Sequence, residues 1–337
     1  MEARSIENII NKIIGVVESH KLDGEEKYAR WIWQSADNDR ELGINEYGCA
    51  DAANILYTVG LFERDADKRA CWISTIQNLQ DKETGLFCEK THSVIHTTAH
   101  CLAALELFDI GPLYPVCAME KYKDISALYD LLGNLDWKHK PWPQSHNGAG
   151  IYVIMNLTNM ATEEWNDAYF RWLWEHTDYE SGMIGKKTGD RDCARDYEYM
   201  AGTFHYLFNM EYAKTPLRYP ERVIDCCLKM YENKDKGELP ERFSSSINFI
   251  QIDWIYCITR ALRQCSYRYE ECIKVLEHFA EEYLNYLDEI DVLDDGFNDL
   301  HLLFGTTCAL AELQQALRGK IKTRKPLRLV LDRRPFI

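Results

Sequence analysis

Six of the ten histidines in this sequence fall just before, or within, stretches that are apolar on every side. They are His92, His96, His100, His146, His205 and His301. Five carboxylates occupy equivalent places, namely Glu46, Asp51, Asp196, Asp253 and Asp299. Imidazole and carboxylate groups are costly to desolvate unless they are paired or used. Their shared placement therefore predicts a site for acid/base chemistry.

Three of the histidines follow one another at intervals of four residues. On a continuous helix His92, His96 and His100 would share one face. Two imidazoles at that spacing can chelate a metal ion if a carboxylate completes the set. The zinc motif HExxH is absent, because Ser93 follows His92. We therefore expect no cofactor and keep a divalent metal at the three histidines as the alternative; hydrogen bonds to loop carbonyls and contacts to substrate also stay open.

The carboxylates suit glycoside hydrolysis, which needs one acidic side chain as proton donor and a second as base or nucleophile. Because the five come from different parts of the chain, we expect some pairs to face each other. Asp51 lies inside an apolar run, a poor position for a helix cap, whereas Asp196 could cap the helix that follows it. The catalytic residues that we predict are Asp51, Asp196, Asp253, His96, His146 and His301.

Aromatic side chains lie among these polar residues and point to the substrate. Sugars present a mixture of CH faces and hydroxyls, so we infer a carbohydrate. Tyr47 and Trp142 would stack on sugar rings, and Arg191 would hold a uronate carboxylate. The substrate-binding residues that we predict are Glu46, Tyr47, His100, Trp142, Gln144, Arg191, Tyr197, His205, Asn248, Gln251, Trp254 and Asp299.

The elements that would position these residues form a repeat. Three stretches, 72–106, 172–211 and 283–313, each contain an amphipathic helix, a turn with glycine and a second, more apolar helix. Fainter copies begin near Trp31, Leu128 and Val223, with second helices at 50–61, 149–157 and 250–262. This gives six units of about 45–55 residues. Six half-exposed helices and six buried ones predict an all-α double ring of helical hairpins.

Residues 69–73 and 80–87, with Trp72, Gln80 and Gly85, resemble the QW repeat of the terpene cyclase and protein prenyltransferase superfamily. Phe87 stands where that repeat usually has tryptophan. The resemblance implies an (α/α)6 toroid, a fold shared with six-hairpin glycosidases and several polysaccharide lyases, with the site in the central funnel at one end of the inner helices. The DxDD and DDxxD motifs of terpene chemistry are absent, and Asp192-Cys193 lacks the intervening residue of the prenyltransferase zinc pattern.

Composition limits the partners and the cellular compartment that we expect. The net charge of −15 argues against nucleic acid and anionic membranes as partners, and no run approaches the roughly 18 apolar residues of a membrane span. The twelve cysteines lack a secretory context, so we expect reduced thiols in a cytoplasmic protein. We expect one toroid domain over 1–320 and a basic, extended C-terminal strap over 321–337. Oligomeric state stays open.

Together these features predict a carbohydrate-active enzyme, most simply a glycoside hydrolase acting on an oligosaccharide or another small glycoside. Three alternatives remain. The first is a uronate-directed polysaccharide lyase or epimerase with histidine or tyrosine as base. The second is a non-enzymatic ring that binds a small ligand or a peptide. The third is a divergent relative of terpene cyclases and prenyltransferases.

Overall fold

The computed structural model describes residues 1–24, 26–187, 189 and 192–337. It is predominantly helical, as predicted. The helices are α1 Glu7–Ser19, α2 Glu46–Thr58, α3 Ala66–Gln77, α4 Val94–Glu106, α5 Ile125–Gly133, α6 Pro141–Leu157, α7 Glu163–Glu175, α8 Asp196–Ala213, α9 Pro220–Glu232, α10 Ile250–Gln264, α11 Tyr269–Glu289, α12 Leu300–Ala316 and α13 Val330–Arg333. Two short 3-10 segments, Cys117–Lys123 and Lys234–Lys236, and two short strands, β1 Arg4–Ser5 and β2 Ile321–Lys322, complete the described elements.

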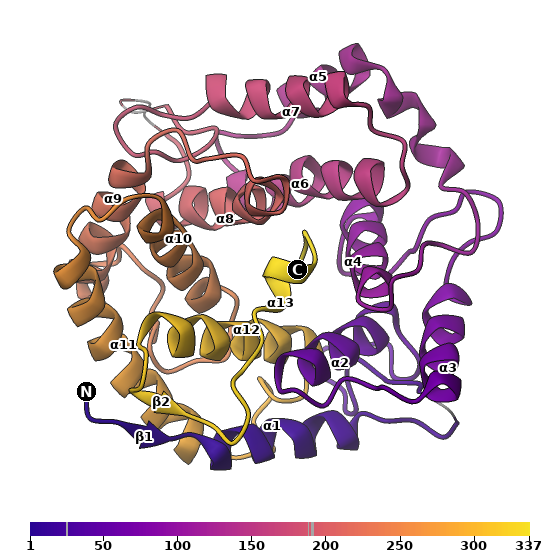
Figure 1. Ribbon diagram of the computed structural model, residues 1–337, viewed down its shortest axis with the longest axis horizontal. Coiled ribbons are helices and arrows are strands. Elements are labelled where there is room, and N and C mark those ends of the chain that lie inside the picture. The colour runs from indigo at the N-terminus through magenta and orange to yellow at the C-terminus, as the bar shows by residue number, and fades with distance from the viewer. Residues whose placement is uncertain (25, 188, 190–191) are drawn as a thin grey trace.

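The even-numbered helices from α2 to α12 form a closed circuit in which each packs on the next and α12 packs again on α2 (Figure 1). The odd-numbered helices from α1 to α11 lie outside this circuit (Figure 1). Hydrophobic patterning explains the division. The stretch from Ile151 to Met155 in α6 is buried at every position, whereas α9 buries only one stripe. The chain therefore alternates between outer and inner positions, and consecutive inner helices start at the same end of the ring.

The turns that join outer to inner helices repeat the same hydrogen bonds. Thr98 of α4 accepts the backbone N–H of Phe87 at 3.0 Å, and Thr203 of α8 accepts that of Ile184 at 2.9 Å. Each turn contains a glycine in the left-handed region. These are Gly85, with φ +74°, and Gly182, with φ +71°. A Cβ at Gly85 would lie 2.1 Å from the carbonyl oxygen of Pro115, so only glycine fits this position.

The first unit differs from the prediction. Trp31 does not lie on an outer helix but in the loop between α1 and α2, where it pairs with Leu42 in an isolated bridge and stacks on the guanidinium of Arg30. The helix outside this part of the ring is α1, which contacts α11 and α12. Among the described residues, none of the helices reaches both the length and the apolarity of a membrane span.

The C-terminal segment crosses the end of the ring at which the inner helices finish. β2 pairs in parallel with β1, and the chain then enters the ring as α13 (Figure 1). Arg333 donates to the side chain of Glu106 at 2.8 Å and to its backbone carbonyl at 2.7 Å, at the negative end of the α4 dipole. Phe336 is buried between His96 and Phe208. The segment over 321–337 is thus extended only in part, and whether it is separate from a domain over 1–320 stays a prediction.

Candidate functional site

The six histidines named above, which we call the histidine cluster, meet inside the ring. They come from the N-terminal parts of α4, α6 and α12, from the middle of α8 and from the residue that precedes the α4 cap. The ring centroid of His96 lies 4.6 Å from that of His92 and 4.4 Å from that of His146. The His146 centroid is 4.6 Å from that of His205, and His301 is 5.2 Å from both His92 and His100. Residues spread over more than 200 positions therefore share one site.

Asp51 of α2 joins two of these imidazoles. Its Oδ1 is 2.7 Å from His100 Nε2, and its Oδ2 is 2.9 Å from His301 Nδ1. Burial raises the pKa of Asp51 well above its usual value, while the positive charges of Arg334 and Arg30 oppose the shift. Burial also lowers the pKa of His100 and His301 well below 6.5. Both imidazoles are therefore neutral near pH 7 and can each donate one N–H to the carboxylate.

Tyr47 of α2 contacts the rings of His96 and His100 and orients them. Its hydroxyl oxygen is 2.5 Å from His96 Nδ1 and 3.3 Å from Thr97 Oγ1. Its ring stacks on His100 at 4.9 Å between centroids, and the guanidinium of Arg30 covers it at 4.9 Å. These contacts fix the His96 ring plane before any ligand binds.

The loops beside the cluster carry a buried charge network. Arg30 donates to both carboxylate oxygens of Asp299, at 2.8 and 2.9 Å, and to Thr91 Oγ1 at 2.8 Å. Glu89 accepts from the backbone N–H and the hydroxyl of Thr91, and its carboxylate is 3.7 Å from His92 Nδ1. Burial alone would raise the pKa of Glu89, but the bonds from His92 and Thr91 and the charge of Arg30 lower it to about 2. Glu89 is therefore ionised.

The α6–α8 side contains a serine–histidine contact that does not form a nucleophile. Ser145 Oγ is 2.5 Å from the carbonyl oxygen of Trp142, which can only accept, and 2.9 Å from His205 Nδ1. Since the hydroxyl hydrogen is given to Trp142, the serine oxygen accepts from His205 Nδ1–H. His146 lies between His96 and His205, and neither of its ring nitrogens has a hydrogen-bond partner among the described residues. Burial lowers its pKa well below 6.5.

Several predicted site residues have structural contacts outside the cluster. Asp196 pairs with Lys186 at 2.7 Å. Trp254 donates to the carbonyl of Cys227 and stacks on Tyr231 of α9, so it faces the outer layer. Gln251 donates to the carbonyl of Phe243 and to Ser246 in the loop before α10. The remaining ones are half-buried Trp142, Gln144 and Tyr197 and exposed Asn248; Arg191 lies outside the described residues.

Two predicted carboxyl groups are protonated or nearly so. Asp253 is fully buried, and neither of its carboxyl oxygens has a partner within the described part of the chain. Burial raises its pKa well above the usual value. It lies two helical turns before Arg260 on the same face of α10, and Arg260 reaches Asp332 of α13 inside the ring. Burial, aided by the charge of Glu89, also raises the pKa of half-buried Glu46 to about 7.

The cluster contains three sets of groups that could hold a metal ion, with ligand atoms within 4.8 Å of one another. They are His92 with His96 and His301; His96 with His146 and His205; and Asp51 with His100 and His301. In the third set the atoms are already joined by hydrogen bonds. His92, in the loop before α4, and His96 of α4 thus lie together with His301, whereas His100 contacts Asp51.

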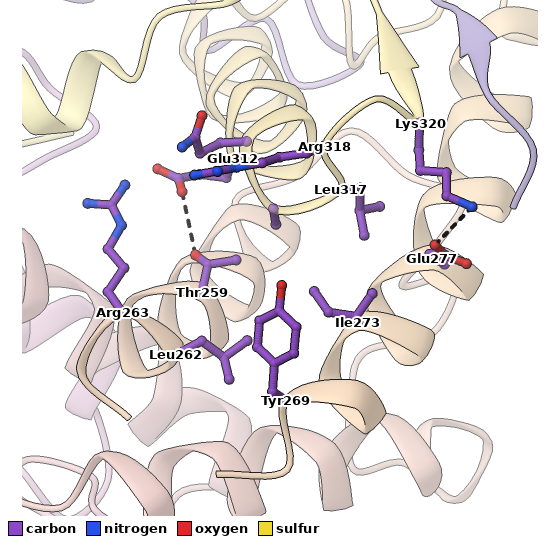
Figure 2. A pocket seen from close by; sticks show the side chains of 12 residues that line it. Thr259, Leu262, Arg263, Tyr269, Ile273, Glu277, Glu312, Leu317, Arg318 and Lys320 are labelled. Carbon is purple, nitrogen blue, oxygen red and sulfur yellow. Dashed lines mark hydrogen bonds and ion pairs between the residues drawn. The ribbon is translucent and has the colours of Figure 1, made fainter. Parts of the chain in front are cut away.

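A separate pocket of about 550 Å³ lies between α10, α11 and the C-terminal part of α12 (Figure 2). Part of its charged lining is paired. Lys320 lies 3.4 Å from Glu277, and Thr259 donates to Glu312 at 3.4 Å (Figure 2). The pocket is at the end of the ring opposite the N-terminal turns of the inner helices, so it is not part of the histidine cluster.

No protein-family model, no curated protein and no solved structure matches the chain. The function must therefore be inferred from the geometry of the cluster.

Proposed function

We propose that the chain is an (α/α)6-toroid enzyme whose active site is the histidine cluster. The closed circuit of inner helices and the repeated turn hydrogen bonds support this fold. α13 and Phe336 fill the C-terminal end of the ring, so substrate would enter from the N-terminal end, where His92 is half-buried and Ser93 is exposed. A set of four buried and two half-buried imidazoles opposes folding unless it is bonded or used, which favours a functional role.

The reaction that fits this site best is proton abstraction from a uronate, as in a polysaccharide lyase or epimerase. Asp51, Asp196 and Asp299 are all held in hydrogen bonds or ion pairs, so they do not form a free pair of carboxylates. The observation that carries the proposal is His146, a half-buried imidazole whose two ring nitrogens have no hydrogen-bond partner among the described residues. In an elimination His146 would take the C5 proton, the C4–O bond would break, and the leaving oxygen would receive a proton from solvent water. An epimerase would return the proton to the opposite face.

Glycoside hydrolysis is the second candidate, and Asp253 favours it. A general acid must carry a proton at neutral pH, and burial keeps one on this carboxyl group. Glu46, with its pKa raised to about 7, is a second group able to donate a proton. A terpene-type reaction is less suited, because the cluster is lined by polar imidazoles and charged side chains rather than by an apolar wall.

A lyase assay on uronate polymers tests the first candidate. We expect unsaturated product, seen as a rise in ultraviolet absorbance, and a loss of at least about 100-fold in kcat for His146→Ala. His139→Ala is the matched control, because His139 is exposed and contacts only Asp136, and it should retain full activity. A proton exchange signal by NMR without absorbance would identify an epimerase. New reducing ends without absorbance would favour hydrolysis, and tight binding without any product would contradict an enzymatic role.

A further inference from the structure

Three imidazoles of the cluster, those of His92, His96 and His301, are each held at Nδ1 by an oxygen atom. His92 Nδ1 is 2.7 Å from Thr91 Oγ1, His96 Nδ1 is 2.5 Å from the hydroxyl of Tyr47, and His301 Nδ1 is 2.9 Å from Asp51 Oδ2. No Nε2 atom of the three has a hydrogen-bond partner among the described residues. Histidines that bind metals show this arrangement, in which an oxygen orients the ring through one nitrogen and the other nitrogen binds the ion.

The hydrogen-bond network sets the tautomer of His92 and allows the same tautomer in His301. The Thr91 hydroxyl donates its hydrogen to Glu89 at 2.6 Å and accepts from Arg30 at 2.8 Å. Its second lone pair is left for His92 Nδ1–H. His301 Nδ1 can likewise donate its hydrogen to Asp51 Oδ2 at 2.9 Å. In both neutral rings the lone pair is then on Nε2.

The third ring allows the same tautomer. The Tyr47 hydroxyl can donate to Thr97 Oγ1 at 3.3 Å while its oxygen accepts from His96 Nδ1–H at 2.5 Å. His96 Nε2 is then unprotonated. The free lone pairs thus belong to a loop residue, to α4 and to α12, and one ring nitrogen of each residue lies within 4.8 Å of those of the other two.

We propose that the Nε2 atoms of His92, His96 and His301 bind one divalent transition-metal ion of the zinc type. Three imidazoles without thiolate or carboxylate suit Zn²⁺, and a site with three protein ligands keeps one position open for water or substrate. Bonds of about 2.0–2.1 Å would bring the three nitrogens to about 3.3 Å apart, which small rotations about the side-chain torsions can achieve. The half-buried ring of His92 provides the route from solvent.

The charges around the three rings are compatible with a cation. Asp51 lies 2.9 Å from His301 Nδ1, and Glu89 lies 3.7 Å from His92 Nδ1. Both carboxylates would stabilise the ion through its ligands. The inference deepens the proposed function, because a bound Lewis acid would neutralise the carboxylate of a uronate. Its test does not depend on activity.

Zinc binding to the metal-stripped full-length protein tests the site. Isothermal titration with ZnCl₂ at pH 7.5, followed by elemental analysis after desalting, should give one ion per chain with Kd below about 1 µM. The apo protein should also gain thermal stability with zinc. His92→Ala and His301→Ala should each weaken binding by about 100-fold. His92 is in a loop and half-buried, so this variant should fold even if His301→Ala does not.

His205→Ala is the matched control, since His205 belongs to the alternative set with His96 and His146. It should bind zinc like the unchanged protein. Less than about 0.1 ion per chain, or equal affinity in His92→Ala and the unchanged protein, would overturn the proposal. Loss of binding in His205→Ala but not in His92→Ala would assign the ion to the other set and would overturn it as well. One ion per chain with no turnover of any uronate would leave the metal site in place and contradict the proposed function.

Discussion

Acidification from pH 7 to pH 4.5 is expected to lower the free energy of unfolding by several kcal/mol, which is a large share of the whole stability of many domains. Burial lowers the pKa of all six histidines of the cluster, so they are neutral in the folded protein and take up protons on unfolding near pH 6.5. Their contribution is present above pH 6.5 and is lost as the pH falls. For His205, with its pKa lowered to about 3, this amounts to about 2.5 kcal/mol over the range, and the other five histidines act in the same direction.

Three buried carboxyl groups act in the opposite direction. Burial raises the pKa of Asp51, Asp253 and Glu46, so their contribution is present at low pH and is lost as the pH rises through the folded pKa. They offset part of the histidine effect, but six imidazoles outnumber three carboxyl groups, so we expect a net loss on acidification.

Urea unfolding at pH 7, 5.5 and 4.5 measures this effect. The midpoint should fall at each step, with an unchanged slope against denaturant. His139→Gln, which removes an exposed histidine, should follow the same curve as the unchanged protein. A stability that is flat between pH 7 and 4.5 would mean that the imidazoles accept protons in the folded state, which contradicts their burial.

Arg260→Ala is expected to destabilise the protein by about 4 kcal/mol. Arg260 of α10 is fully buried and pairs with Glu312 of α12, with Asp332 of α13 and, at 3.4 Å, with Glu211 of α8. Its removal leaves Glu312 buried without its cation. Urea unfolding at pH 7 measures the loss.

Arg263→Ala is the matched control, because Arg263 contacts the same Glu211 and Asp332 from a partly exposed position. Its removal should cost at most about 1 kcal/mol. The double variant Arg260→Met with Glu312→Leu should recover most of the stability, since it removes both buried charges together. Equal losses for the two single arginine variants would contradict the role of burial.

The helical class could be predicted because burial follows from hydrophobic periodicity. The starts of the inner helices could not. α2 begins at Glu46 rather than at residue 50, because the Asn45 side chain accepts from the N–H groups of Tyr47 and Gly48 and caps the helix. α6 begins at Pro141 rather than at residue 149. Polar residues at the site interrupt the apolar runs by which a buried helix is recognised. The hydrophobic pattern therefore predicts a start that is several residues too late.

Part of the site could also be predicted from the sequence, because its histidines follow the helical repeat. Histidines that follow the repeat could be identified, because equivalent positions in successive units lie at the same end of the ring. Arg30 and Glu89 could not, since they come from loops without periodicity. Neighbouring residues on a helix that is buried all round point about 100° apart, and no pattern shows which one faces inward. Trp254 therefore faces α9, whereas Asp253 lies on the same side of α10 as Arg260.

The convergence of the histidines on one ion is tested most directly by anomalous scattering from a crystal of the protein soaked in zinc. The expected result is a single strong peak at the zinc edge, bounded by the Nε2 atoms of His92, His96 and His301. Well-ordered imidazoles with no peak between them, or a peak held only by residues outside the cluster, would contradict it.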